Sequence, residues 1–492
     1  FSQRFITSVL LLLILSITIF SCEQNDDSDI DNINNKKVFE GNITISNLNE
    51  IGNNKITEIK GNLQIKSSDL INLTDLNTLT SITGNLEIFG NDNLTSLDGL
   101  KNIISIGGSL SISSNKNLKS VNGINDIKSI GGNLVITNHD NLEVITGLEN
   151  ITSDIEQLVI SGNKKLTSIN GLSNIKSVKT VLEIRNNDNL TSVNGLENIT
   201  FIDGNLQIHN NLNLKTIDLL GELEEINGNL WILENPQLNS IKGLNKISLI
   251  KGDARIRENN LTSLMTLDNN LSVLGGFYLL LEKNLTSING LQKLTSVGKQ
   301  FSISDNNKLT SIEELENLES VGNLHIYRNE KLTSITGLNS IASLNYLGIG
   351  DNKSLTTING LNNVSTLNNG ISIAYNENLT TISALENLTN VASISGEFQI
   401  RENYKLESIG SLTNITSVGG DFRIRGNTNL KSLKGIENIA SIEGILVVAL
   451  NTNLSDLCGI TKVIQNGFSN SYVVYDNQYN PTKQNIINGN CN

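Results

Sequence analysis

The stretch NLTSVNGLENITFIDGNLQIHNN, residues 189–211, decides the fold, because close variants of it recur along most of the chain. It contains three apolar segments separated by Gly, Asn and Asp. In the last segment Leu206 and Ile208 flank Gln207, which is the period-two alternation of a strand with one buried face. A helix of about ten residues does not fit between such bends. Each unit is therefore predicted to be one turn of a coil that contains two or three short strands.

The repeat can be followed through one apolar position, the leucine of GNLxI. A single unit cannot close its own core, but stacked units place each leucine beside its equivalent in the coil before, roughly 4.8 Å away. The sequence predicts an all-β parallel solenoid of about 17–18 coils, most of them 23–24 residues long. The marker positions are Ile43, Leu63, Leu86, Leu110, Leu134, Leu158, Leu182, Leu206, Leu230, Ala254, Tyr278, Phe301, Leu324, Leu347, Ile371, Phe398, Phe422 and Leu446.

An asparagine follows the marker strand in most coils. A side-chain amide can bond backbone groups at a tight bend, and stacked amides can bond one another, so these residues are predicted to form a structural ladder. In the first half of the chain the predicted rungs are Asn91, Asn115, Asn138, Asn163, Asn187, Asn211, Asn235 and Asn259.

The beginning of the chain differs in composition from the repeats. Residues 1–21 carry Arg4 and a short apolar run, which is typical of a secretory signal, and the Ile-Phe-Ser-Cys that ends at Cys22 resembles the lipobox of bacterial lipoproteins. That resemblance implies lipid on Cys22 and an outer-membrane location exposed at the cell surface, with membrane contact through the lipid only. Residues 22–40 are acidic at their start and are expected to be a disordered tether, acting either as an export cue or as a spacer.

The two remaining cysteines lie near the C-terminus. Cys458 and Cys491 belong to a chain expected to leave the reducing cytoplasm, so we predict a disulfide between them; two free buried thiols are the alternative. The repeat pattern lapses after residue 457. Residues 41–457 are therefore assigned to the solenoid and 458–492 to a C-terminal cap that shields its last coil.

Charge and motifs exclude several functions. The formal charge of −13 argues against nucleic acid as a partner. The histidines, His139, His209 and His325, fall in different coils and cannot share a metal. No HExxH, P-loop, CxxC or GxSxG motif occurs, so neither catalytic residues nor a cofactor is predicted.

The outward residues of the marker strands are not determined by the core, and they vary from coil to coil. Adjacent coils place aromatic and guanidinium groups side by side, a composition favoured in protein interfaces. The alternative is an ordinary sheet face with scattered side chains. The candidate ligand-binding residues, called here the Trp231 patch, are His209, Trp231, Leu233, Arg255 and Arg257.

The repeat resembles leucine-rich repeats and, more closely, the receptor L-domain family, over roughly residues 41–457. The resemblance implies a right-handed, single-stranded parallel β-helix and a non-enzymatic role at a cell surface. The cap also resembles the ending of some bacterial surface lipoproteins. The residues that carry the repeat resemblance are Leu134, Ile136, Leu142, Gly147, Leu148, Asn150 and Ile151, with their equivalents in other coils.

These observations favour a monomeric, non-enzymatic surface lipoprotein that binds a protein or polysaccharide through the solenoid face, for adhesion or ligand capture. One alternative is a structural envelope or spacer protein without a discrete ligand. A second alternative is a carbohydrate-active enzyme, because parallel β-helices include polysaccharide lyases and hydrolases.

Overall fold

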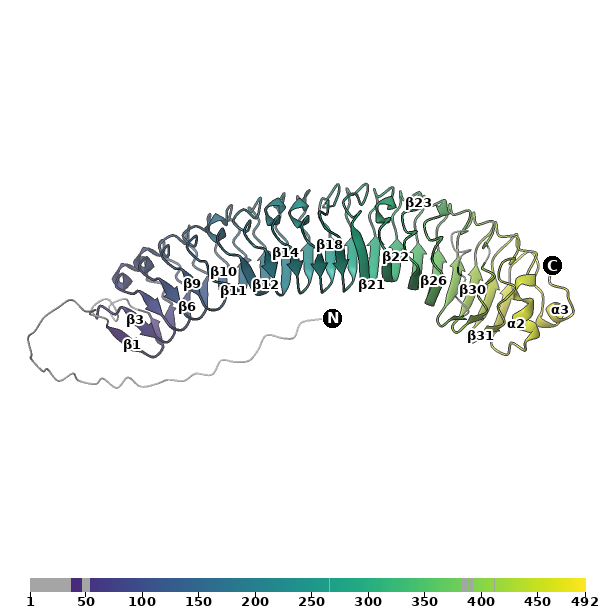
Figure 1. Ribbon diagram of the computed structural model, residues 1–492, viewed down its shortest axis with the longest axis horizontal. Helices are drawn as coiled ribbons and strands as arrows, with labels where there is room; N and C mark the ends of the chain where they lie inside the picture. Colours follow the sequence, from purple (N-terminus) through teal and green to yellow (C-terminus); the bar gives the residue numbers. More distant parts are fainter. Residues whose placement is uncertain (1–36, 47–53, 265, 383–387, 389–392, 411) are drawn as a thin grey trace, which may run out of the picture. The chain divides into compact units, whose positions relative to one another are not determined.

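The computed structural model describes residues 37–46, 54–264, 266–382, 388, 393–410 and 412–492, and residues 37–492 form one compact unit. Cys22, the predicted signal and nearly all of the predicted tether lie outside the described residues. Strand β1 (Val38–Glu40) pairs in parallel with β3 (Glu58–Lys60), so the first coil starts before residue 41. The predicted all-β parallel solenoid is confirmed, with coils side by side along the chain (Figure 1).

One strand from each coil joins a long parallel sheet, the main sheet, which contains the GNLxI segments. In register, each marker residue lies beside the marker of the next coil, as Leu206 does beside Leu230. In order, the main-sheet strands are β2 (Ile43–Ile45), β4 (Leu63–Ile65), β6 (Leu86–Phe89), β8 (Leu110–Ser113), β10 (Leu134–Thr137), β11 (Ile155–Ser161), β12 (Ser177–Arg185), β14 (Asn205–His209), β16 (Leu230–Leu233), β18 (Ala254–Arg257), β20 (Phe277–Leu280), β21 (Leu294–Ser304), β22 (Ser320–Tyr327), β24 (Ser343–Gly350), β26 (Thr366–Ala374), β28 (Phe398–Arg401), β30 (Phe422–Arg425), β32 (Leu446–Ala449) and β33 (Tyr472–Tyr475).

A second row of short strands precedes the main sheet in each coil, and in the longest strands, such as β21, the two rows merge through a bulge. A third row is thinner, with β23 (Ser334–Ile335) beside β25 (Thr357–Ile358) and isolated bridges elsewhere. The second row comprises β1, β3, β5 (Ser81–Ile82), β7 (Ser105–Ile106), β9 (Ser129–Ile130), β13 (Phe201–Ile202), β15 (Glu225–Ile226), β17 (Leu249–Ile250), β19 (Leu271–Val273), β27 (Ser393–Ile394), β29 (Ser417–Val418) and β31 (Ser441–Ile442).

Short helical turns complete many coils at the GL segment. Among the described residues the 3₁₀ turns are η1 (Thr74–Leu76), η2 (Asp98–Leu100), η3 (Asn170–Leu172), η4 (Asp218–Leu220), η5 (Lys242–Leu244), η6 (Glu313–Leu315) and η8 (Cys458–Ile460). Two described α-helices, α2 (Thr461–Gln465) and α3 (Lys483–Ile487), lie in the C-terminal cap.

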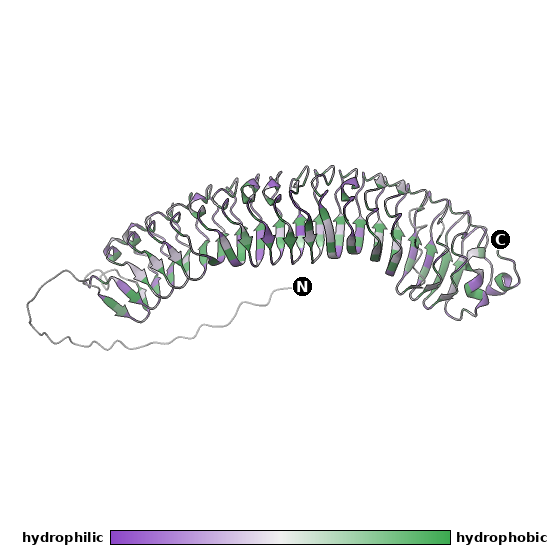
Figure 2. Cartoon of the chain, in the orientation of Figure 1, coloured by the Kyte–Doolittle hydropathy of each residue, from purple (hydrophilic) through white to green (hydrophobic). Residues whose placement is uncertain are grey.

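The core is a set of apolar columns that run through the coils. Hydrophobic and more polar residues alternate along the main-sheet strands (Figure 2), and burial alternates with them, so the hydrophobic residues face inward. The inward residues of the coil at 190–208 are at most 1% exposed. Each coil must therefore repeat the same apolar residues to continue the core. In the coil at 190–208 they are Leu190, Val193, Leu196, Ile199, Ile202, Leu206 and Ile208.

One marker position differs from the prediction. The partner of Ala254 in the next coil is Phe277, not Tyr278. Phe277 is 1% exposed and stacks on Phe301 with ring centroids 5.2 Å apart. Because side chains alternate along a strand, the one-residue change turns Tyr278 outward.

The asparagine ladder is present and buried. The Asn211 backbone N–H donates to Oδ1 of Asn235 at 3.1 Å, while the Asn211 side-chain amide donates to the Ile184 carbonyl at 3.0 Å. Each rung therefore ties its coil to the coils on both sides. The rungs continue through the described chain at Asn306, Asn329, Asn352, Asn376, Asn403, Asn427, Asn451 and Asn477.

Two of the described rungs are not asparagine. The predicted rung Asn138 is wrong, because Asn138 has a positive φ of 61° at the bend and its neighbour His139 takes the buried place. Nε2 of His139 lies 3.2 Å from the Ile112 carbonyl, and Nδ1 accepts from the Asn115 N–H at 3.2 Å. A neutral imidazole, with one donor and one acceptor nitrogen, thus replaces the amide. In a later coil the rung is Glu282, and burial raises the pKa of this carboxyl.

The substitution His139→Asn is expected to weaken the pH dependence of stability. Burial lowers the pKa of His139 below 6.5, whereas the unfolded chain binds a proton near that value. Stability is therefore full above about pH 6.5 and falls as the pH decreases from there toward the folded pKa, by up to about 1.4 kcal/mol per pH unit. Unfolding free energies of both proteins at several values between about pH 7 and pH 5 test this. Parallel curves for the two proteins would contradict it.

The C-terminal cap is closed by the predicted disulfide. Cys458 and Cys491 are bonded, with Cα atoms 4.9 Å apart, and the Leu457 N–H donates to the Cys491 carbonyl at 2.8 Å. The main sheet and the ladder continue into the cap, through β33 beside β32 and through Asn477. The segment that the sequence separates as a cap therefore also adds one further strand to the solenoid.

Candidate functional site

The outward face of the main sheet carries the Trp231 patch, and the structure brings its residues together. Trp231 lies between Gln207 and Arg255 in the parallel register, and Leu233 lies between His209 and Arg257. The guanidinium carbon of Arg255 is 5.7 Å from the Trp231 ring centroid. This geometry is that of a cation–π contact.

Tyr278 belongs to the same surface, although the sequence analysis missed it. Arg255 pairs with Tyr278 in the next strand, and its guanidinium carbon is 5.1 Å from that ring centroid. Arg255 is therefore sandwiched between Trp231 and Tyr278. The sequence pattern places Tyr278 in the core, because Tyr278 and not Phe277 falls at the marker position, and so does not show it as a surface residue.

The charges of the Trp231 patch are largely neutralised within the protein. Arg255 pairs with Asp253 at 2.9 Å and Arg257 pairs with Glu234 at 3.0 Å. His209 lies 3.4 Å from Glu183, and a hydrogen bond from His209 lowers the pKa of that carboxyl. The Trp231 indole N–H is buried without a hydrogen-bond partner. The patch thus has aromatic surface and one unused donor, but little free charge.

A second feature of the same face is a hollow that extends from β22 to β30. The outward residues of β24 include Gly348 and Gly350, and those of β26 are Ser372 and Ala374. Large side chains stand on the strands at either side. Two neighbouring strands with small outward side chains therefore leave a trough about two strand spacings wide.

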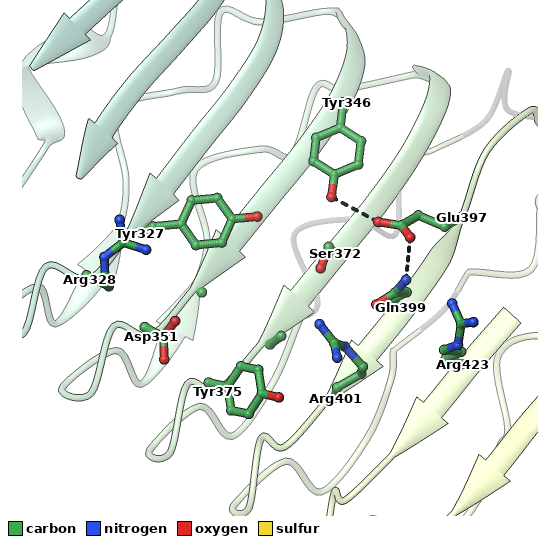
Figure 3. Close-up of a pocket in the computed structure, with 12 residues that line it drawn as sticks. Tyr327, Arg328, Tyr346, Asp351, Ser372, Tyr375, Glu397, Gln399, Arg401 and Arg423 are labelled. Carbon is green, nitrogen blue, oxygen red and sulfur yellow. Dashed lines mark hydrogen bonds between the residues drawn. The ribbon is translucent and has the colours of Figure 1, made fainter. Parts of the chain in front are cut away.

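The cavity in this trough has a volume of about 520 Å³ and is called here the tyrosine pocket (Figure 3). This volume lies within the usual range for small-ligand sites. Its lining residues are Tyr327, Arg328, Tyr346, Gly350, Asp351, Ser372, Ala374, Tyr375, Glu397, Gln399, Arg401 and Arg423.

Tyr327 lies across the glycines of the neighbouring strand. A Cβ atom at Gly348 would be 2.2 Å from the Tyr327 hydroxyl, and one at Gly350 would be 2.7 Å from its ring. Any larger residue at either position would displace the tyrosine. The two glycines therefore allow an aromatic ring to form one wall of the pocket.

A polar network forms the opposite wall. The Tyr346 hydroxyl donates to one oxygen of Glu397 at 3.2 Å, and the Gln399 side-chain amide donates to the other (Figure 3). Burial raises the pKa of Tyr346 and of Tyr327, so both hydroxyls remain protonated at neutral pH. Gln399 is only 6% exposed. The carboxylate is thus held in one orientation by neutral donors.

Arg401 lies beside this network. Its guanidinium carbon is 5.5 Å from the ring centroid of Tyr375, and its Nε atom is buried without a hydrogen-bond partner. Arg328 and Arg423, at the pocket's edges, pair with Asp305 and Asp421.

The tyrosine pocket was not predicted, although part of its signal is visible in the sequence. Tyr327, Gln399, Arg401 and Arg423 occur at the variable outward positions. The decisive residues are the small ones in GIG (348–350) and SIA (372–374). Gly348 and Gly350, and then Ser372 and Ala374, occupy outward positions in two successive coils.

In the described part of the chain, the His, Cys, Asp and Glu residues include no group of three placed to hold a metal ion. Between residues 37 and 492, no described helix has both the length and the apolar character needed to cross a bilayer.

No family model and no curated protein matches the chain. Among solved structures, a leucine-rich-repeat protein of Leptospira interrogans is similar, with 15% identity and a TM-score of 0.33, over 92% of this chain and 99% of that one. The TLR13–ssRNA13 complex is also similar, with 13% identity and a TM-score of 0.21, over 87% of this chain and 82% of that one.

Proposed function

We propose that the protein is a non-enzymatic cell-surface lipoprotein that captures a protein or glycan partner through the outward face of its main sheet. One observation carries the proposal: Trp, Tyr and Arg side chains gather on that face, at positions that the core leaves free. Such residues dominate the binding energy of interfaces. The tyrosine pocket adds concavity, which a flat sheet face lacks.

The proposed location depends on the first residues of the sequence. Lipid on Cys22 would hold the solenoid at the outer membrane, facing the exterior, and would be its only contact with the bilayer. The chain would act as a monomer, without cofactor or nucleic acid. The resemblance to receptor L domains and bacterial surface lipoproteins supports this proposal.

A retention experiment tests the proposal. Residues 37–492, which contain the sheets and the cap, would be immobilised and probed with extracellular-matrix proteins and polysaccharides. We expect at least one probe to be retained, and Trp231→Ala with Arg255→Ala, or Arg401→Gln alone, to weaken retention by about tenfold or more. Lys119→Ala is a matched surface change outside the main sheet and should have no effect.

The same experiment separates the alternatives. Retention that is insensitive to every main-sheet change, or no retention at all, would favour a structural spacer, for which the stacked core and ladder suffice. Turnover of a polysaccharide in the panel would favour a carbohydrate-active enzyme instead.

A further inference from the structure

The tyrosine pocket contains an unusual arginine. Among the described residues, every arginine except Arg401 has its guanidinium within an ion pair. Arg401 instead stacks on Tyr375, and its buried Nε has no partner. An unpaired, partly buried guanidinium is a ready counter-charge for an anion, because charge-assisted hydrogen bonds to it are strong. The other pairs are Arg185–Glu183, Arg255–Asp253, Arg257–Glu234, Arg328–Asp305, Arg423–Asp421 and Arg425–Glu402.

The rest of the pocket does not suit a densely charged anion. The carboxylates of Glu397 and Asp351 line the same cavity and would repel a second or third negative group. Neutral donors and acceptors also line the cavity, namely the Ser372 hydroxyl and, beside Glu397, the Gln399 amide (Figure 3). A ligand with one negative group and several hydroxyls satisfies both observations.

The tyrosines restrict the ligand further. Tyr327, Tyr346 and Tyr375 place aromatic rings around a cavity of about 520 Å³. A pyranose ring offers an apolar C–H face to an aromatic ring and hydroxyls at its edge. Pockets that combine ring surfaces with a few fixed polar groups are typical of small-ligand recognition.

The site also disfavours an extended peptide. The strands beneath it, β24, β26 and β28, are each paired on both sides within the main sheet. Their backbone groups are used by neighbouring strands, so a peptide would find no strand edge to extend.

We infer that the tyrosine pocket binds a hexuronate unit of an acidic polysaccharide, with the carboxylate on Arg401 and the hydroxyls on Gln399 and Glu397. The inference rests on the proposed function and names the class of its ligand.

Matched ligands can test the charge. An oligohexuronate, the same oligomer with its carboxylates reduced to alcohols, and an acidic peptide would be titrated against the protein by calorimetry. We expect the oligohexuronate to bind best. Arg401→Gln should weaken it by about 10- to 100-fold, which corresponds to one charge-assisted contact, and should barely change binding of the reduced oligomer.

Two further variants control for position and folding. Arg425→Gln removes the arginine beside Arg401 in the next strand; this residue is paired with Glu402 and does not line the pocket, so hexuronate binding should be retained. Ala374→Leu fills the floor of the trough and should abolish binding of both oligomers, while the melting temperature reports whether the fold is kept.

Equal hexuronate binding by Arg401→Gln and the unmodified protein would overturn the inference, as would tighter binding of the peptide. If neither oligomer binds but another probe is lost on changing Trp231 and Arg255, the ligand class is wrong and the proposed function stands. If no probe responds to any main-sheet change, both fail.

Discussion

Replacing Asn235 by alanine is expected to lower the free energy of unfolding by about 3–5 kcal/mol. Asn235 is fully buried, and its Oδ1 accepts from the Asn211 backbone N–H at 3.1 Å and the Asn211 side-chain amide at 3.2 Å. Its own amide donates to the carbonyls of Ile208 and Leu233, both at 3.0 Å. Alanine would leave several of these groups buried without partners, at about 1–3 kcal/mol each.

An exposed asparagine in the preceding coil provides the control. Asn213 makes one surface hydrogen bond, to the Asp188 carbonyl at 2.8 Å, so Asn213→Ala should cost less than about 1 kcal/mol. Chemical denaturation measures both variants. Hydrogen exchange should show faster opening in the coils next to residue 235, because coils contact only their neighbours. Similar losses for the two variants would show that the ladder is not a main source of stability.

The fold could be predicted because each coil repeats the same inward residues. In one coil, however, the sequence does not show which residues of the strand point inward. Around Phe277 and Tyr278 the sequence reads GGFYLLLE, in which neighbouring apolar residues fit either alternation. In the structure, Phe277 is the inward residue, because it stacks on Phe301. This contact involves residues a whole coil apart, so local alternation does not reveal it.

The ladder shows a similar limit at His139. A search for asparagine selects Asn138, since an imidazole is a different residue type with the same donor and acceptor pattern. At this rung the buried side chain supplies one donor and one acceptor, as an asparagine amide does. A search by residue type therefore finds a rung only where the rung is an asparagine.

The candidate sites were predictable to different degrees. The Trp231 patch needs only the register, so its members could be listed from the sequence. The tyrosine pocket depends on how far side chains reach: Tyr327 lies flat across Gly348, and Gln399 turns to Glu397. Those orientations follow from three-dimensional packing among four coils, which a one-dimensional pattern does not encode.

The substitution Gly204→Ala is expected to destabilise the solenoid by about 3 kcal/mol or more. In the sequence, Gly204 looks like a bend residue. In the structure, a Cβ at this position would lie 1.7 Å from the Thr180 carbonyl oxygen of the preceding coil. On the other side, the Gly204 carbonyl accepts from the Gly228 N–H at 2.8 Å. Backbone atoms of the coils before and after Gly204 both lie close to it, so neither coil can move away to make room for a methyl group without losing its stacking.

Gly221 provides the opposite case. Its φ is −67°, and the nearest atom to an added Cβ is the Asp218 oxygen at 3.7 Å. Gly221→Ala should therefore stabilise the fold by about 0.4–1 kcal/mol, since alanine restricts only the unfolded chain. Denaturation midpoints of the two variants should shift in opposite directions. A higher midpoint for Gly204→Ala would show that the close approach of the coils is not the reason for glycine at residue 204.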